Sequence, residues 1–69
     1  MKFSAQNVFL GKVTRLVPFA AGIEVTLELP GGMVLVSNIS NLAGKNLDLK
    51  KGDEIYAVIK ASNVMLVAE

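Results

Sequence analysis

The chain has 69 residues, enough for one domain and no more. It contains no Cys and no His, which excludes disulfides and the softer metal ligands. Seven basic and six acidic residues leave a net charge of +1, which is not the charge pattern of a protein that binds duplex nucleic acid or an anionic membrane.

The chain is unusually apolar for its size. Hydrophobic residues make up 52% of the chain, and its mean hydropathy is +0.51. A domain this small buries only about 60% of the surface of its unfolded chain, so it has too little core for that many apolar side chains. We therefore expect a homo-oligomer whose contacts bury the remainder.

No feature of the sequence predicts a membrane or secretory destination. No apolar run approaches the ~20 residues of a membrane helix, so we expect no membrane insertion. The start of the chain turns polar by Ser4, too soon for the apolar core of a signal peptide. A cytoplasmic protein is the expectation.

The first half of the chain predicts three strands. Residues 7–17 form the first, and Gly11 within it marks a bulge or a close backbone approach. Pro18 is expected to end this strand or to mark a sheet edge. Residues 23–29 alternate between apolar and polar side chains, as a half-buried strand does. The run Pro30-Gly31-Gly32 predicts a hairpin turn, and residues 33–39 form the returning strand, whose apolar outer face should meet another subunit or sheet.

The second half predicts one short helix and two more strands. Ser40 or Asn41 caps one or two helical turns that end near residue 47. Residues 54–60 are interpreted as a strand buried on both faces, and residues 64–68 as a fifth strand. Three leucines are expected to plug the open end of the sheet: Leu42, Leu47 and Leu49. The prediction is a single all-β domain over residues 1–69, an OB-like five-stranded barrel with one short helical turn.

The sequence does not favour catalysis. It has no His, no Cys and no Ser in a nucleophile-elbow context. Its internal carboxylates fall on a wet strand face or in turns, where they are interpreted as solvated charges: Glu24, Glu28, Asp48, Asp53 and Glu54. We predict a protein that is not an enzyme and offers no direct ligands to a metal ion.

Nucleic-acid binding is an alternative because OB-type barrels often bind single strands, using exposed aromatic side chains in a basic groove. Here the aromatic residues are scattered and mostly occupy apolar positions: Phe3, Phe9, Phe19 and Tyr56. Packing in a core or an interface is the favoured interpretation, and no nucleic-acid partner is expected. Oligonucleotide binding that weakens with rising salt would indicate the alternative.

Two polar stretches of small residues suggest an oxyanion site. They are Ser4-Ala5-Gln6-Asn7 and Lys60-Ala61-Ser62-Asn63. A lysine at a strand end is most often merely solvated. If the two stretches meet, however, they supply hydroxyls, an amide, an ammonium and free N–H groups, and no carboxylate. Such a site favours an anion that carries no proton at neutral pH, such as molybdate or tungstate, over hydrogen phosphate, which has to donate a hydrogen bond.

Several segments together resemble the Mop family, also called molbindins, to which TOBE domains are related. The most specific is the run from Gly52 to Met65, with Tyr56-Ala57-Val58-Ile59-Lys60-Ala61-Ser62 at its centre. The resemblance covers essentially the whole chain and includes the opening Ser4-Ala5-Gln6-Asn7 and the Ile39-Ser40-Asn41 turn. It implies a strand-exchanged dimer, assembly of dimers into a hexamer, oxyanions bound at subunit interfaces, and storage or homeostasis of molybdate or tungstate.

The resemblance also implies a set of oxyanion-binding residues. Ser4, Ala5 and Gln6 would come from one chain, Lys60, Ala61 and Ser62 from its partner, and Ser40 would add a hydroxyl. Gln6 stands where the family usually has Arg, which predicts weaker binding because a neutral amide replaces a bidentate cation.

A second class of site is implied before Glu24, where the family often carries Asn, Thr or Ser. This chain has Ala20, Ala21 and Gly22 there, so such a site would depend on backbone N–H groups.

One alternative keeps the fold and changes the function. In it the chain is a ligand-sensing or docking module for a partner protein, such as a molybdate-transporter ATPase or a regulator. The neutral Gln6 is the feature that favours this alternative, because it removes a cation from the implied anion site.

Overall fold

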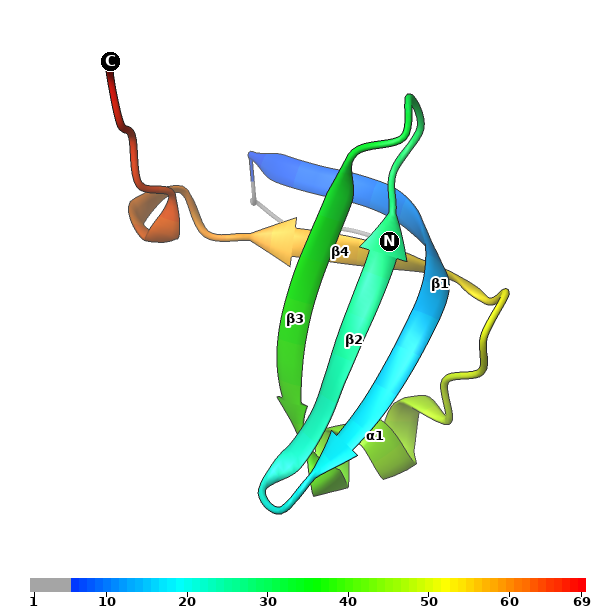
Figure 1. The fold of residues 1–69 in the computed structure, drawn as a ribbon. Helices are drawn as coiled ribbons and strands as arrows, with labels where there is room; N and C mark the ends of the chain where they lie inside the picture. Colours follow the sequence, from blue (N-terminus) through cyan, green and yellow to red (C-terminus); the bar gives the residue numbers. More distant parts are fainter. Residues whose placement is uncertain (1–5) are drawn as a thin grey trace.

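The computed structural model describes residues 6–69, which form one curled antiparallel sheet with a short helix at one end (Figure 1). The strands are β1 (Asn7–Phe19), β2 (Gly22–Glu28), β3 (Val34–Ser40) and β4 (Glu54–Ile59). The helix α1 (Asn41–Leu47) follows β3, and a 3-10 turn, η1 (Ala61–Asn63), follows β4. The strands are ordered β3-β2-β1-β4, so β3 and β4 are the two edges.

The long strand β1 curls the sheet because it pairs with different strands along its length. Its first half pairs with β4 and its second half with β2, and Lys12 is in register with both Glu54 and Glu28. An irregularity in the register follows between Val13 and Arg15. A Cβ on Gly11 would lie 3.1 Å from the Leu27 Cβ, so the close approach predicted at this glycine is confirmed.

Pro18 does not end the first strand. It lies inside β1, in register with Ile23. The last residues of β1 pair only with β2, so β1 is a local edge of the sheet at Pro18, and edge strands are where proline is tolerated. Of the two expectations for Pro18, the edge position is the one observed.

The core sits inside the curl of the sheet. Val13, Val25 and Leu27 are its most buried side chains, and half-buried residues from every strand and from the segment after α1 pack around them. The predicted alternation along the second strand is confirmed, since Val25 and Leu27 are buried and Glu28 is exposed.

The predicted turn is confirmed too: Gly31 and Gly32 both have φ near +90°, and the Leu29 N–H donates to the Met33 carbonyl at 2.7 Å.

The helix α1 is short and begins at the predicted cap. The Ser40 hydroxyl oxygen accepts a hydrogen bond from the Ala43 N–H at 3.1 Å. Gly44 is buried against Ile23, and Leu49 packs on the core after the helix ends. The expectation that Leu42 plugs the sheet is wrong, because its side chain is 68% exposed.

Strand β4 is buried on one face only, so the prediction of burial on both faces is wrong for the single chain. Ile55, Ala57 and Ile59 face the curl, whereas Tyr56 and Val58 alternate with them and are about half exposed. The strand is an edge of the sheet, and among residues 6–69 no layer covers its outer side.

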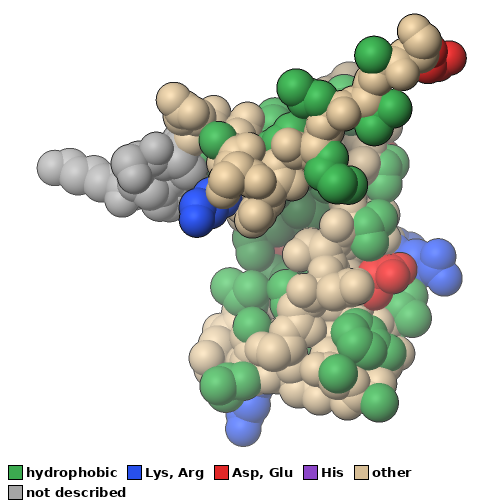
Figure 2. Space-filling model, turned by 90° about the vertical axis from the view of Figure 1, so that its left-hand side faces the viewer, with side chains coloured by type: hydrophobic (Ala, Val, Ile, Leu, Met, Phe, Trp, Pro, Cys, Tyr) green, Lys and Arg blue, Asp and Glu red, His purple; other side chains and the backbone are tan. Residues whose placement is uncertain are grey.

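Residues 64–69 form no strand in the single chain, so the expected fifth strand is missing from it. They extend away from the sheet as a tail (Figures 1 and 2). A strand exists only where a neighbour completes its hydrogen bonds, and the tail has no such neighbour among the described residues. Met65, Leu66 and Val67 are each about 90% exposed, and they are the most exposed large apolar side chains of the described chain.

The total accessible surface is large for the mass. It is 5601 Å², whereas a compact monomer of this mass exposes about 4,200 Å². The excess is the surface of an open sheet and a free tail, which is the surface that an oligomer would cover.

Candidate functional site

One end of the β1–β4 pair brings two of the predicted polar segments together. Asn7 is in register with Ile59, and its side-chain amide donates to the Ile59 carbonyl at 3.2 Å. Gln6 and Lys60 are the next residues along the two antiparallel strands, so they follow as neighbours at this end. Ser4 and Ala5, the other predicted residues of the first segment, lie outside the described residues.

The second polar segment forms a compact turn directly after β4. Lys60 is extended, and η1 then closes with an N–H of Asn63 donating to the Lys60 carbonyl at 2.8 Å. Within residues 6–69, no hydrogen bond uses the N–H groups of Ala61 or Ser62, or the side chains of Gln6, Lys60 or Ser62. Lys60, Ala61 and Ser62 are all exposed. This end therefore presents an ammonium, a hydroxyl, an amide and main-chain donors to solvent.

Ser40 lies at the opposite end of the sheet. It is in register with Gly22, at the far end of β2 from the turn, and β1 ends beside it at Phe19. Asn41 donates from its side chain to the Ala20 carbonyl at 3.3 Å. Ser40 thus lies with Ala20, Ala21 and Gly22, the second-site candidates, and within one chain the structure does not bring it to Gln6 and Lys60.

The second-site segment is tightly packed on the main chain. A Cβ on Gly22 would lie 1.9 Å from the Ile39 carbonyl oxygen, so only glycine fits there. The Ser40 hydroxyl already accepts the cap hydrogen bond from Ala43, but its own proton remains available to donate.

No cluster of metal ligands accompanies either end. Among residues 6–69, no three acidic side chains gather closely enough to hold a metal ion. The ion pair in this part of the chain joins Lys50 and Asp48 at 3.2 Å, in the segment after α1. The polar end at Gln6 and Lys60 therefore offers hydrogen-bond donors to an anion. Neither of its two polar segments carries a carboxylate that would compete with the anion for those donors.

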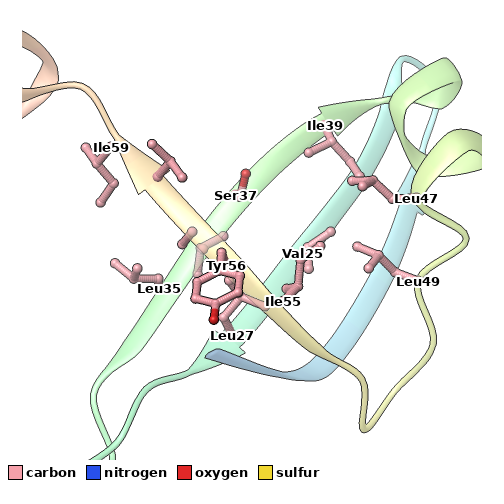
Figure 3. Close-up of a pocket in the computed structure, with 13 residues that line it drawn as sticks. Val25, Leu27, Leu35, Ser37, Ile39, Leu47, Leu49, Ile55, Tyr56 and Ile59 are labelled. Carbon is pink, nitrogen blue, oxygen red and sulfur yellow. The ribbon is translucent and has the colours of Figure 1, made fainter. Parts of the chain in front are cut away.

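An apolar hollow opens between the two sheet edges (Figure 3). The cavity has a volume of about 260 Å³, and β3 and β4 supply most of its walls. Its lining includes Val25, Leu27, Leu35, Ile39, Leu47, Leu49, Ile55 and Ile59. A second apolar hollow, of about 430 Å³, lies beyond Leu35 and Ile59 and is lined also by Phe9, Met33 and Val64. Such walls suit an apolar segment and not an anion.

Sequence reasoning missed these hollows. The apolar runs 33–36 and 55–59 are the sequence signal for these apolar walls. The second run was interpreted instead as a strand buried on both faces within the chain. The hollows exist because β3 and β4 are not paired with each other, and pairing between distant strands is not visible in a local pattern.

The described residues contain no helix that is long and apolar enough to span a membrane.

Comparison with known proteins gives consistent matches over almost the whole chain. The TOBE domain matches residues 4–66. A probable molybdenum-pterin-binding protein from Haemophilus influenzae is 42% identical over 69 residues, which are the whole of both chains. Molybdenum-pterin-binding protein 1 from Clostridium pasteurianum is 41% identical over 68 residues, or 99% of this chain and 100% of that protein.

Solved structures agree with the sequence matches. MopII from Clostridium pasteurianum, in an apo form, superposes with a TM-score of 0.91 at 39% identity, over 97% of this chain and 100% of that one. The cytoplasmic molybdate-binding protein ModG, in a form with molybdate bound, gives a TM-score of 0.83 at 36% identity, over 96% of this chain and 53% of that one. The curled sheet, the capped helix and the matches along the full length show that this chain belongs to the TOBE domain family, among the molybdenum-pterin-binding (Mop) proteins.

Proposed function

We propose that this protein binds molybdate or tungstate where copies of the chain meet, and that it serves cytoplasmic storage or homeostasis of the oxyanion without catalysing a reaction. The observation that carries the proposal is the donor-only end formed by Gln6, Lys60, Ala61 and Ser62, which are exposed; within the described chain the side chains of Gln6, Lys60 and Ser62 and the N–H groups of Ala61 and Ser62 make no hydrogen bond. The molybdenum-related names of full-length relatives support the same ligand.

The chemistry of the donors favours this class of anion. Molybdate and tungstate are dianions without a proton at neutral pH, so every oxygen accepts hydrogen bonds. An ammonium, a hydroxyl, an amide and main-chain N–H groups all donate, and charge-assisted bonds of this kind are the stronger ones. Hydrogen phosphate would leave its own O–H without an acceptor, which is costly where water is excluded.

An interface is the natural place for the site because the single chain leaves it open. Lys60 and Ser62 are exposed, and the apolar tail begins two residues after Ser62. If the tail fills the hollow between β3 and β4 of a second copy, it becomes the fifth strand and closes the barrel. The turn that carries Lys60, Ala61 and Ser62 is then the crossing point between two chains. Ser40, which lies far from Lys60 in one chain, would also come from another copy, and Ser4 and Ala5 complete the proposed set.

Substitution of Lys60 tests the site. Lys60→Ala removes the ammonium and should weaken molybdate binding about tenfold or more, because a charge-assisted hydrogen bond contributes more than a neutral one. Calorimetric titration measures the change. Lys45→Ala is the matched control, since Lys45 is an exposed lysine on α1. Equal affinity of the Lys60→Ala variant and the wild-type protein would refute the site assignment.

Gln6→Arg is the complementary change. An arginine next to Lys60 would supply a bidentate charged donor, so molybdate affinity should rise by about tenfold. Asn46→Arg adds the same charge on the exposed end of α1 and should leave the affinity unchanged. A rise in both variants would indicate a general charge effect, and a rise in neither would remove Gln6 from the site.

A further inference from the structure

The side chain of Asn7 ties the end of strand β4 to the start of strand β1. These antiparallel strands run side by side, and Asn7 and Ile59 are the last two residues in register at the polar end. There the Asn7 side-chain amide donates to the Ile59 carbonyl oxygen at 3.2 Å. Asn7 is half-buried, whereas Gln6 and Lys60, the next residues of the two strands, are exposed. A side chain therefore holds the main chain at the point where β4 ends.

The Ile59 carbonyl belongs to the same peptide unit as the Lys60 N–H. A peptide unit is planar, and among the described residues every peptide bond is trans. Holding the carbonyl oxygen therefore fixes the plane from which the main chain of Lys60 leaves the strand. On the other side of Lys60, the Asn63 N–H donates to the Lys60 carbonyl oxygen at 2.8 Å. Lys60 thus lies between two peptide units that are both held by hydrogen bonds.

The two held peptide units set the direction in which the Lys60 side chain leaves the main chain. Lys60 has φ −62° and ψ 132°, and these two angles describe how its flanking peptide planes are turned relative to each other. The side chain itself is exposed and makes no hydrogen bond or ion pair within residues 6–69. The main chain is therefore the part of the described structure that orients it. A side chain whose base is already oriented has less conformational freedom to lose when its ammonium meets a ligand.

We propose that Asn7 is a positioning residue for the oxyanion site: it fixes the Ile59–Lys60 peptide and thereby directs the Lys60 ammonium toward the anion. This inference rests on the proposed function. Asn7 acts through Lys60 and does not touch the anion. An asparagine suits the position because its amide is neutral and donates. An aspartate of the same shape would turn an acceptor toward the Ile59 carbonyl and would add a carboxylate beside an anion site.

The same strand offers a matched hydrogen bond away from the polar end. The Thr14 hydroxyl donates to the Thr26 carbonyl oxygen at 3.3 Å, and Thr14 is half-buried, as Asn7 is. It ties β1 to β2, and Asn7 ties β1 to β4. Both are bonds from a side chain to a main-chain carbonyl of the neighbouring strand. Loss of the Thr14 bond therefore reproduces the structural effect of losing the Asn7 bond without disturbing Lys60.

Two shape-conserving substitutions test the proposal. Asn7→Leu and Thr14→Val each remove the donor and keep the branching of the side chain. Asn7→Leu should weaken molybdate binding by about tenfold, because a misdirected ammonium loses most of a charge-assisted hydrogen bond. Thr14→Val should leave the affinity unchanged. Calorimetric titration measures both, and urea denaturation measures the loss of stability in each variant. Circular dichroism confirms folding, and Asn7→Ala replaces Asn7→Leu if the latter does not fold.

A double-mutant cycle with Lys60→Ala separates positioning from direct contact. If Asn7 acts through Lys60, the combined variant should lose about as much molybdate affinity as Lys60→Ala alone, roughly tenfold. Two independent contacts with the anion would instead multiply to about a hundredfold.

A measurement without ligand tests the same link between Asn7 and Lys60. The NMR three-bond coupling between the amide and α protons of Lys60 reports its φ. It should move in Asn7→Leu toward the average of a flexible residue, and it should stay at the wild-type value in Thr14→Val.

Three outcomes overturn the proposal: wild-type affinity in Asn7→Leu, equal losses of affinity in Asn7→Leu and Thr14→Val, or independent losses in the cycle with the Lys60 coupling unchanged. The second would mean that any loosening of β1 weakens binding, and the third that Asn7 contacts the anion itself. Failure of the proposed function gives a different result. A wild-type protein that binds neither molybdate nor tungstate, but whose Lys60 coupling changes in Asn7→Leu, would reject the oxyanion site and keep the control of Lys60 by Asn7.

Discussion

Gly22 is the residue at which the fold tolerates no side chain. The Cβ of an alanine there would lie 1.9 Å from the Ile39 carbonyl oxygen, which belongs to the main chain of β3. Gly44 differs, because the atom nearest to a Cβ added there, at 2.6 Å, is Cδ1, the far end of the Ile23 side chain. Backbone cannot move without breaking the pairing of β2 with β3, whereas an isoleucine terminus can rotate.

Gly22→Ala should therefore destabilise the protein by about 1–3 kcal/mol. Gly44→Ala should change stability much less, since an alanine gains about 1 kcal/mol of helix propensity over glycine and offsets the displacement of Ile23. Urea denaturation of both variants measures the difference. Equal losses in the two would mean that the contact of Gly22 with Ile39 does not limit this position.

Single candidate residues for an anion site can be chosen from the sequence, but their grouping in space cannot. The small polar residues at both ends of the chain indicate an anion site from their chemistry alone, and Ser40 is recognisable as a helix cap because a serine precedes the helical turn. That Ser40 lies at the opposite end of the sheet from Lys60 depends on the pairing of β1 with β4, which joins segments far apart in the sequence, and local sequence does not encode that register.

At the scale of the elements, hairpins and alternation were predictable and the last strand was not. The second strand and the Pro30-Gly31-Gly32 turn follow from local patterns that determine their own structure. The apolar tail, residues 64–68, has the composition of a strand, but it has no neighbour in its own chain with which to pair. The prediction that β4 is buried on both faces fails for a related reason, because the part of the chain that the structure describes contains no layer that covers its outer face.

Two tail substitutions test whether the tail becomes a strand in the assembly. Leu66 and Val67 are both 91% exposed in the single chain, so aspartate at either position should be harmless to an isolated tail. In a strand they point to opposite faces. One of Leu66→Asp and Val67→Asp should then bury a charge and break the assembly, while the other is tolerated.

Sedimentation velocity distinguishes these cases, and Asn46→Asp on α1 controls for the added charge. Tolerance of both tail variants would mean that the tail stays free in the assembly. Disruption by both would mean that both faces are covered, and would contradict a half-buried fifth strand.

At the scale of the whole molecule, the chain exposes more surface than its mass warrants. Exposed apolar residues lie on the outer face of the β1–β4 pair, in the hollow between β3 and β4 and along the tail, and Figure 2 shows hydrophobic side chains in several places on one side of the molecule. The high apolar content of the sequence predicted an oligomer. It did not predict which apolar surfaces the single chain leaves exposed, because that depends on how the sheet curls around β1.

Titration of the purified protein with molybdate, beside sulfate and with the mass measured by light scattering, tests the proposed function most directly. We expect saturable molybdate binding on an assembly of several chains and no response to sulfate. A well-folded assembly that binds neither molybdate nor tungstate would contradict the proposal, and the chain would then be better explained as a module that docks on a partner protein.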